Sequence, residues 1–358
     1  MNRYLRAGSG VTVAMSFIWM AAGATSAGNG SPASGDRPFE GRVLNITSWG
    51  GPWTEATKQF YTDPFSEETG VTVNFLETGG DQTAYVLLQA RQNTMDVDLM
   101  DGSDAGQLLL QEVLQPYPAE LVAMMEERVQ PKYVHEYFLG FGNAASLVVC
   151  NPGLVDACPE TPAEFFDVEN FPGDRGMTAS YDSVMTLALL ADGVPGDELF
   201  PIDIERSIAK LEEIRPHVTV WADSGARQQQ MLTDEEVGIA YVWSGRAYQA
   251  MKDRIPELQF QWGAATMGHG NGYLVPVGAP NADISFALIE WILEHPEAQA
   301  QWTMATMYET PTLELLDLIP EDVAANLPTK FDVPEVPSDA LAEQADELLP
   351  AWQEFITG

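Results

Sequence analysis

An aromatic ring, a hydroxyl group and a guanidinium group meet at one junction of the sequence. Trp243 ends the apolar stretch 237–243, and the turn Ser244–Gly245 leads to Arg246 at the start of an expected helix. Open α/β sheets bind ligands at the carboxyl ends of their strands, where the free N–H groups of a helix start can hold a polar group. The junction therefore favours binding of a polar solute. The alternative interpretation makes Trp243 a core residue and Ser244 only a helix cap.

A second arginine has a similar setting. Arg227 lies in the first turn of the helix expected after Asp223. A guanidinium can hold a carboxylate or phosphonate through two parallel hydrogen bonds, whereas Asp182 or Asp223 can hold an ammonium group. Together with Arg246, these side chains suit a zwitterion. Either arginine could instead form an ion pair at the surface or between lobes.

The remaining candidates for ligand binding follow other strand ends or lie on a glycine-rich crossing. They are Trp49, Gly50, Glu77, Ser103, Tyr181, Trp221, His269 and Asn271. Trp221 could equally be a core residue, Glu77 could cap a helix, and His269 could be only a hinge residue. These residue types bind ligands without covalent chemistry, and we expect no metal ion or cofactor.

The elements that position these residues alternate in type. Strands expected at Val43–Trp49, Val71–Leu76 and Val97–Met100 are separated by helical stretches. This order predicts an α/β fold, with a parallel sheet and right-handed crossovers. The chain is expected to cross into a second lobe near Phe138–Ser146 and to return near Phe260–Gly278.

The length of 358 residues exceeds what one hydrophobic core usually serves, so two lobes are expected. We expect residues 42–142 and 270–313 to form lobe 1 and residues 143–269 to form lobe 2. Residues 314–358 are expected to form a helical tail.

The beginning of the chain is typical of a secretory signal peptide. Arg3 and Arg6 precede an apolar run at 11–20, and small residues follow it up to residue 27. Residues 28–41 are rich in Gly, Ser and Pro and predict a flexible leader. We therefore expect cleavage of residues 1–27 and a soluble protein exported to the periplasm.

The two cysteines agree with export. Cys150 and Cys158 flank a short Pro- and Gly-containing loop, which favours a disulfide in an oxidising compartment. Two free thiols are the alternative. A zinc site is less supported, because no further ligands flank the pair.

The formal net charge is −36, from 53 acidic and 17 basic residues. Such a surface repels nucleic acid and anionic membranes and thereby excludes both as partners. It favours a cationic ligand only faintly, because acidic surfaces are also common in proteins that work at high salt.

Five stretches in this order resemble the extracytoplasmic solute-binding proteins of ABC importers, most of all the spermidine/putrescine-binding branch. They are Asn45–Trp53, Asp96–Ser103, Asp234–Arg246, Ile284–Pro296 and Tyr308–Thr312. The resemblance implies a two-lobed periplasmic-binding-protein-like fold, with each lobe a mostly parallel sheet flanked by helices and the lobes joined by crossing hinge strands. It also implies closure over one small molecule, delivery to an ABC-type membrane permease, and a monomer.

The resemblance further implies how polyamine binders hold their ligand, with carboxylates at each ammonium and rings around the methylene chain. Trp49 and Trp243 stand where ring partners are expected, and Asp182 lies near the acidic position of the second lobe. At the return crossing, however, polyamine binders offer an acid where this chain has His269 and Asn271. The stretch Trp221–Gln229 also resembles relatives that bind γ-aminobutyrate-type amino acids.

We therefore predict the capture of a small amine-bearing solute, either a polyamine or a zwitterionic amino-acid-like compound. The alternative is a carboxylate- or phosphonate-bearing solute held by Arg227 or Arg246. An enzyme is not expected. Thiamine-cleaving enzymes resemble these two-lobed proteins, but only Cys150 or Cys158 could supply their nucleophile. Ferric-ion binding would need clustered Tyr and His ligands, which Tyr181 and Tyr241 do not form.

Overall fold

The computed structural model describes residues 37–358, apart from residues 77, 79–81, 143, 268–269 and 335. The predicted signal peptide, most of the predicted leader, Glu77 and His269 lie outside these residues. No helix in the described part of the chain is long and apolar enough to cross a membrane.

The larger sheet has five strands in the order β7-β6-β8-β5-β9. The strands are β5 (Ala145–Cys150), β6 (Arg175–Thr178), β7 (Val218–Ala222), β8 (Ile239–Trp243) and β9 (Gln259–Met267). β6 pairs in parallel with β7 and with β8, whereas β5 is antiparallel to β8 and to β9. The sheet is thus mixed, because the chain enters it along β5 and leaves it along β9.

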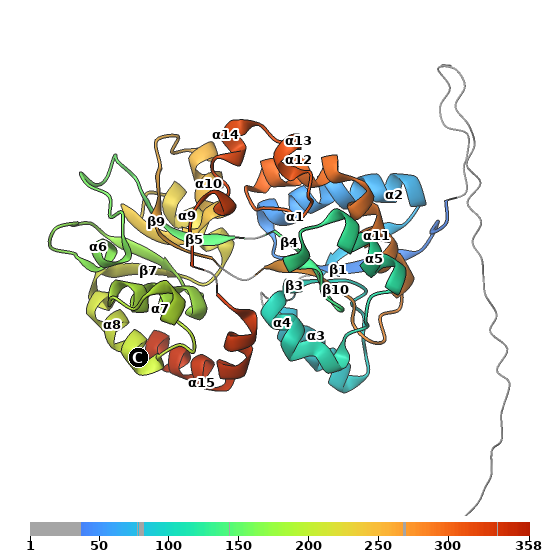
Figure 1. The fold of residues 1–358 in the computed structure, drawn as a ribbon, viewed down its shortest axis with the longest axis horizontal. Coiled ribbons are helices and arrows are strands. Elements are labelled where there is room, and N and C mark those ends of the chain that lie inside the picture. The colour runs from blue at the N-terminus through green and yellow to red at the C-terminus, as the bar shows by residue number, and fades with distance from the viewer. Residues whose placement is uncertain (1–36, 77, 79–81, 143, 268–269, 335) are drawn as a thin grey trace, which may run out of the picture. The chain divides into compact units, whose positions relative to one another are not determined.

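Helices cover both faces of this sheet (Figure 1). They are α6 (Pro162–Phe166), α7 (Tyr181–Ala191), α8 (Ile204–Ile214), α9 (Gly225–Thr233) and α10 (Ser244–Asp253). Side chains along β5 alternate between the faces, since successive residues of a strand point to opposite sides. Val148 and Cys150 join the core under α7 and α8, while Leu147 and Val149 join the core under α9 and α10.

Two smaller sheets hold the other strands, which are β1 (Val43–Thr47), β2 (Thr72–Leu76), β3 (Met100–Ser103), β4 (Leu139–Phe141) and β10 (Asn271–Leu274). β1 and β2 are parallel, and β10 is antiparallel to both β3 and β4. The third expected strand meets β1 at Leu99, which forms a parallel bridge with Ile46 before β3 begins. One smaller sheet is therefore parallel and the other antiparallel, because the returning chain inserts β10 between β3 and β4.

Further helices pack around these smaller sheets and complete their core. They are α1 (Gly51–Thr57), α2 (Asp63–Thr69), α3 (Gln82–Gln92), α4 (Asp104–Leu110), α5 (Ala119–Arg128), α11 (Ala282–Glu294) and α12 (Pro296–Thr306). The core includes Leu44 and Ile46 of β1 and Trp302 of α12, all fully buried. Trp302 packs edge-on against Trp53, with ring centroids 4.7 Å apart.

The C-terminal residues form α13 (Leu315–Leu318), α14 (Glu321–Ala324) and α15 (Ser338–Thr357). Leu315 and Ala324 pack near α12. The apolar face of α15 instead adds Leu348 and Trp352 to the core of α7 and α8. The last helix therefore contributes to the core of the five-stranded sheet, and it also contacts α4 beside the smaller sheets.

The predicted disulfide is confirmed. Cys150, at the end of β5, is bonded to Cys158, and their Cα atoms are 5.7 Å apart. Both cysteines of the chain are used in this bond, so neither is a free thiol.

Candidate functional site

A cavity of about 580 Å³ lies where strand ends of the larger and smaller sheets come together. Its wall is made by the turn after β1, the end of β3, the turns after β6 and β7, and the junction of β8 with α10. This placement follows the general rule that open α/β sheets bind ligands beyond the carboxyl ends of their strands. The volume is within the roughly 300–1,000 Å³ typical of small-molecule sites.

Most of the predicted binding residues line this cavity. They are Trp49, Gly50, Ser103, Asp182, Asp223, Trp243, Arg246 and Asn271. Their segments are far apart in the sequence, and the strand-to-helix junctions bring them together. Their role in binding a ligand stays a prediction.

Three predicted residues are placed elsewhere. Trp221 is directed at the C-terminal helix, with its ring centroid 5.8 Å from that of Trp352 and 5.6 Å from that of Phe355. Arg227 donates two hydrogen bonds of 2.6 Å to the carboxylate of Glu236. Its guanidinium is thus paired on the surface, and it does not line the cavity.

Tyr181, the third of these residues, begins α7 and packs against the core shared with α8. Burial and the adjacent Asp182 raise the pKa of Tyr181 to about 12, so its phenol stays protonated at neutral pH. It also lies outside the cavity lining, although its neighbour Asp182 is part of it.

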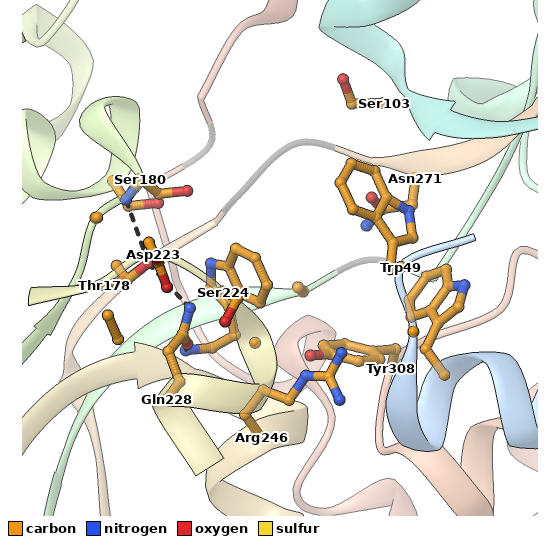
Figure 2. A pocket seen from close by; sticks show the side chains of 18 of the residues that line it. Trp49, Ser103, Thr178, Ser180, Asp223, Ser224, Gln228, Arg246, Asn271 and Tyr308 are labelled. Carbon is orange, nitrogen blue, oxygen red and sulfur yellow. Dashed lines mark hydrogen bonds between the residues drawn. The ribbon is translucent and has the colours of Figure 1, made fainter. Parts of the chain in front are cut away.

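Arg246 is the dominant charge in the cavity wall. It is 3% exposed, and its Nε atom is buried with no hydrogen-bond partner. No carboxylate among the described residues forms an ion pair with it. In Figure 2 its guanidinium lies beside Tyr308, a residue that the sequence analysis did not select. Burial raises the pKa of Tyr308, and the guanidinium opposes part of that shift.

Two glycines make room for this pair. A Cβ atom at Gly225 would lie 2.4 Å from Arg246 Nε, and one at Gly245 would lie 2.5 Å from Tyr308 Cζ. A side chain at Gly225 would displace the guanidinium, and one at Gly245 would also clash with the backbone oxygen of Thr306. The guanidinium therefore packs directly against the N-terminal end of α9, which carries a partial positive charge of its own.

The acidic residues of the wall come from the turns of the larger sheet. Asp182 is 3% exposed in the first turn of α7 and accepts a hydrogen bond from Ser183 Oγ at 3.3 Å. Asp223 follows β7 and is exposed. The cavity therefore offers both a buried cation and carboxylates.

Gln228 of α9 connects two of the turns. Its Oε1 atom accepts from the backbone N–H of Trp243 at 2.9 Å. Its Nε2 atom donates to Thr178 Oγ1 at 3.0 Å (Figure 2). These bonds fix the ends of β6 and β8 relative to α9. The sequence analysis missed Gln228, whose only signal was its place one turn after a helix cap.

Trp49 and Trp53 form an aromatic part of the wall, and both donate to one buried carboxyl group, that of Asp101. Trp53 was not among the candidates for ligand binding, but it lines the cavity. Asp101 was not selected, although it lies on β3 only two residues before Ser103, which was selected.

Residues 61–329 of the chain match the family described as bacterial extracellular solute-binding proteins. The chain belongs to this family. A γ-aminobutyric acid-binding protein of Pseudomonas aeruginosa is 26% identical over 307 residues, which are 81% of this chain and 83% of that protein. The solved Atu4243–GABA receptor is 26% identical, with a TM-score of 0.78 over 88% of this chain and 97% of that one.

PotD, the spermidine/putrescine ABC transporter substrate-binding protein of Streptococcus pneumoniae, shares the fold. Its structure is 19% identical, with a TM-score of 0.65 over 88% of this chain and 99% of that one. The predicted two-lobed fold and family are thus confirmed. This solute-binding protein is the substrate-binding component of an ABC transporter, and not an enzyme.

Proposed function

We propose that this solute-binding protein captures a small zwitterionic, amino-acid-like solute. In this proposal Arg246 holds the acid group of the solute, and Asp182 and Asp223 hold its ammonium group. The rings of Trp49 and Trp243 contact the carbon chain between the two charged ends.

The observation that carries the proposal is the buried guanidinium of Arg246, which lines the cavity and whose Nε atom has no hydrogen-bond partner. Removing a charge from water without a partner is costly, so such a group usually has a counter-ion. Among the described residues the side-chain partner of Arg246 is the phenol of Tyr308, which is not a counter-ion, and the nearby N-terminus of α9 disfavours a cation further. A carboxylate or phosphonate on the solute would remove both penalties through bidentate hydrogen bonds.

The carboxylates argue for an amine on the same solute. Asp182 is buried and Asp223 is exposed, so the two carboxylates can bind an ammonium group at different depths of the cavity. A polyamine could use these carboxylates but has no anionic group for Arg246. The two GABA-binding relatives support the zwitterionic choice, since the ligand in their names carries both charges.

Hydroxyl and amide groups line much of the remaining wall. They belong to Ser48, Ser103, Thr178, Ser180, Ser183, Ser224, Gln228 and Asn271. Together with the volume of about 580 Å³, they offer room and hydrogen bonds for a solute with polar substituents beyond its two charged ends.

A thermal-unfolding screen of the protein against solutes tests the proposal. The panel contains γ-aminobutyrate, longer ω-amino acids, aminophosphonates, polyamines, betaines and simple monocarboxylates. At a concentration of about 100 times its dissociation constant, a true ligand adds about 2.7 kcal/mol and shifts the midpoint by several degrees. We expect stabilisation by zwitterions and aminophosphonates, and none by polyamines.

A matched pair of variants identifies the anchor. Arg246→Met removes the buried guanidinium and should weaken the best solute by about a hundredfold, since truncating one partner of a buried charge pair costs roughly 2–5 kcal/mol. Arg227→Met removes a guanidinium that is paired with Glu236 outside the cavity, and its affinity should match the wild type. Polyamine binding that survives in Arg246→Met would contradict the proposal.

We further propose that capture occurs in the periplasm by closure of the two lobes about the crossing segments, with the protein as a monomer that then meets its permease. The cavity wall, which combines strand ends of the larger and smaller sheets, supports closure. Small-angle X-ray scattering should show a smaller radius of gyration with the best solute than without it. An unchanged radius would argue for a preformed site.

A further inference from the structure

Asp101 lies behind the cavity, on β3, and is 1% exposed. Its carboxyl group accepts hydrogen bonds from Trp49 Nε1 at 3.1 Å, from Trp53 Nε1 at 2.5 Å and from Ser48 Oγ at 3.4 Å. All three donors line the cavity, whereas Asp101 does not. One buried acid thus holds three parts of the wall from outside.

Each of the two indole rings is held through one polar atom, its Nε1 atom. An indole has a single N–H donor and no acceptor, so the bond to Asp101 fixes which way each ring faces. Trp53 is also held by ring contacts, 4.7 Å from Trp302 and 5.3 Å from Tyr308 between centroids. Trp49 is only partly buried, so its orientation depends more on the carboxyl group.

We propose that Asp101 is a positioning residue of the solute site, which holds the Trp49 and Trp53 rings in the cavity wall and holds them more firmly once it is ionised. The effect on affinity rests on the proposed function of the cavity. The hold on the rings does not.

The chemistry of the carboxyl group gives the direction of the effect. An ionised carboxylate accepts both indole bonds in charge-assisted form, whereas a protonated one turns one oxygen into a donor. Burial raises the pKa of Asp101 to about 8, opposed by the bonds from Trp53, Trp49 and Ser48. The change therefore falls within an accessible pH range.

The other ionisable groups packed around these rings keep one state in that range. Tyr273 is the register partner of Asp101 on β10, and burial raises its pKa well above 10. Tyr308 contacts Trp53, and its pKa is raised as well. Of these groups, only Asp101 changes charge between pH 7 and 9.

The first test needs no solute. In protein labelled with ¹⁵N at tryptophan, the indole N–H resonances of Trp49 and Trp53 should shift with a common midpoint near pH 8. The variants Trp49→Phe and Trp53→Phe assign the two signals, and each should leave the other indole titrating. Asp101→Asn should abolish the shift.

Asp98→Asn is the matched control. Asp98 is also fully buried, three residues earlier, but it accepts from the backbone of Asn45 and Asn281 and does not line the cavity. Its variant should retain both indole shifts. Indole signals that do not move near pH 8, or that still move in Asp101→Asn, would overturn the inference.

The second test measures solute affinity from pH 6.5 to 9.5 with γ-aminobutyrate and an aminophosphonate as probes. Wild-type affinity should rise with pH through about 8, because firmer rings cost less ordering on binding. Asp101→Asn should bind up to about tenfold more weakly above pH 8, the scale of a lost charge-assisted bond, with a flat profile. Asp98→Asn should follow the wild-type profile.

A double-mutant comparison separates positioning from general damage. In a Trp49→Phe background the indole donor is gone, so Asp101→Asn should lose most of its effect on affinity. A full, additive effect there would overturn the positioning role. If the indoles titrate as described but neither probe binds, the proposed function fails and the hold on the rings stands. If a probe binds with the same pH profile in Asp101→Asn, only the further inference fails.

Discussion

Arg246 and Arg175 show two ways in which this protein buries a guanidinium group. Arg175 is fully buried and donates to the carbonyl oxygens of Phe165, Gly173 and Phe171 at 3.0, 2.8 and 2.6 Å. Burial lowers its pKa, but its donors are satisfied. Arg246 is nearly as buried and leaves Nε without a partner. The first arrangement satisfies the guanidinium with backbone carbonyl groups, and the second leaves one of its nitrogen atoms without a partner.

Without solute, the buried guanidinium of Arg246 should therefore lower the free energy of unfolding of the protein. We expect Arg246→Met to raise the free energy of unfolding by about 1–3 kcal/mol in the absence of solute, since replacing an uncompensated buried charge by an apolar side chain removes its desolvation cost. Urea denaturation without solute measures this difference.

Arg227→Met is the control for that experiment. It removes a surface ion pair with Glu236, which is worth about 0–1 kcal/mol, so it should be neutral or slightly destabilising. A loss of stability in Arg246→Met larger than in the control would mean that the protein itself, rather than a solute, satisfies the Arg246 guanidinium.

At the scale of elements, β7 and β8 each have a tryptophan near their carboxyl end, but the two side chains have different surroundings. Trp243 is the last residue of β8 and lines the cavity, where Gln228 fixes its backbone N–H. Trp221 is the fourth of the five residues of β7, and its ring contacts α15. The following residue, Ala222, lines the cavity instead. Because side chains alternate along a strand, moving by one residue changes whether a side chain faces the cavity or the core.

The two tryptophans should thus separate binding from stability. Trp243→Ala should weaken solute binding by more than about tenfold, the scale of a lost aromatic anchor. Trp221→Ala should leave affinity nearly unchanged and lower the free energy of unfolding by roughly 3 kcal/mol, because it leaves a void against Trp352 and Phe355. Calorimetric titration and urea denaturation of both variants measure the pair. Equal effects of both variants on affinity would contradict this assignment.

At the scale of the whole molecule, charge repulsion works against folding. The chain has 53 acidic and only 17 basic residues, with a formal net charge of −36 at pH 7. Like charges at this density raise the free energy of the folded state, and salt screens them over a shorter distance as its concentration rises. The acidic surface is therefore a source of salt-dependent stability.

The midpoint of thermal unfolding should rise by several degrees between about 0.05 and 1 M NaCl at pH 7, where the Debye length shortens to about 3 Å. The rise should shrink as the pH approaches the isoelectric point of about 4.1, because the net charge then approaches zero. Calorimetry at both pH values and both salt concentrations provides the comparison. An equal rise at both pH values would point to a general salting-out effect instead.

Local sequence determined the features that depend on residues close together in the chain. The apolar stretch 237–243 and the turn after it predicted a strand, a junction and the position of Arg246. The eight-residue spacing of Cys150 and Cys158 predicted their disulfide. Strand periodicity and loop closure act over a few residues, so the sequence is sufficient for both.

Only the tertiary structure decided which of these residues share a cavity and which side chains hold them. Arg227 and Arg246 each lie in the first turn of a helix, yet Glu236 pairs with Arg227 whereas Tyr308 lies beside Arg246. Asp101 meets Trp49 across about fifty residues of sequence, through the packing of β3 beside β1. These contacts depend on how distant segments pack, and no local pattern encodes that packing.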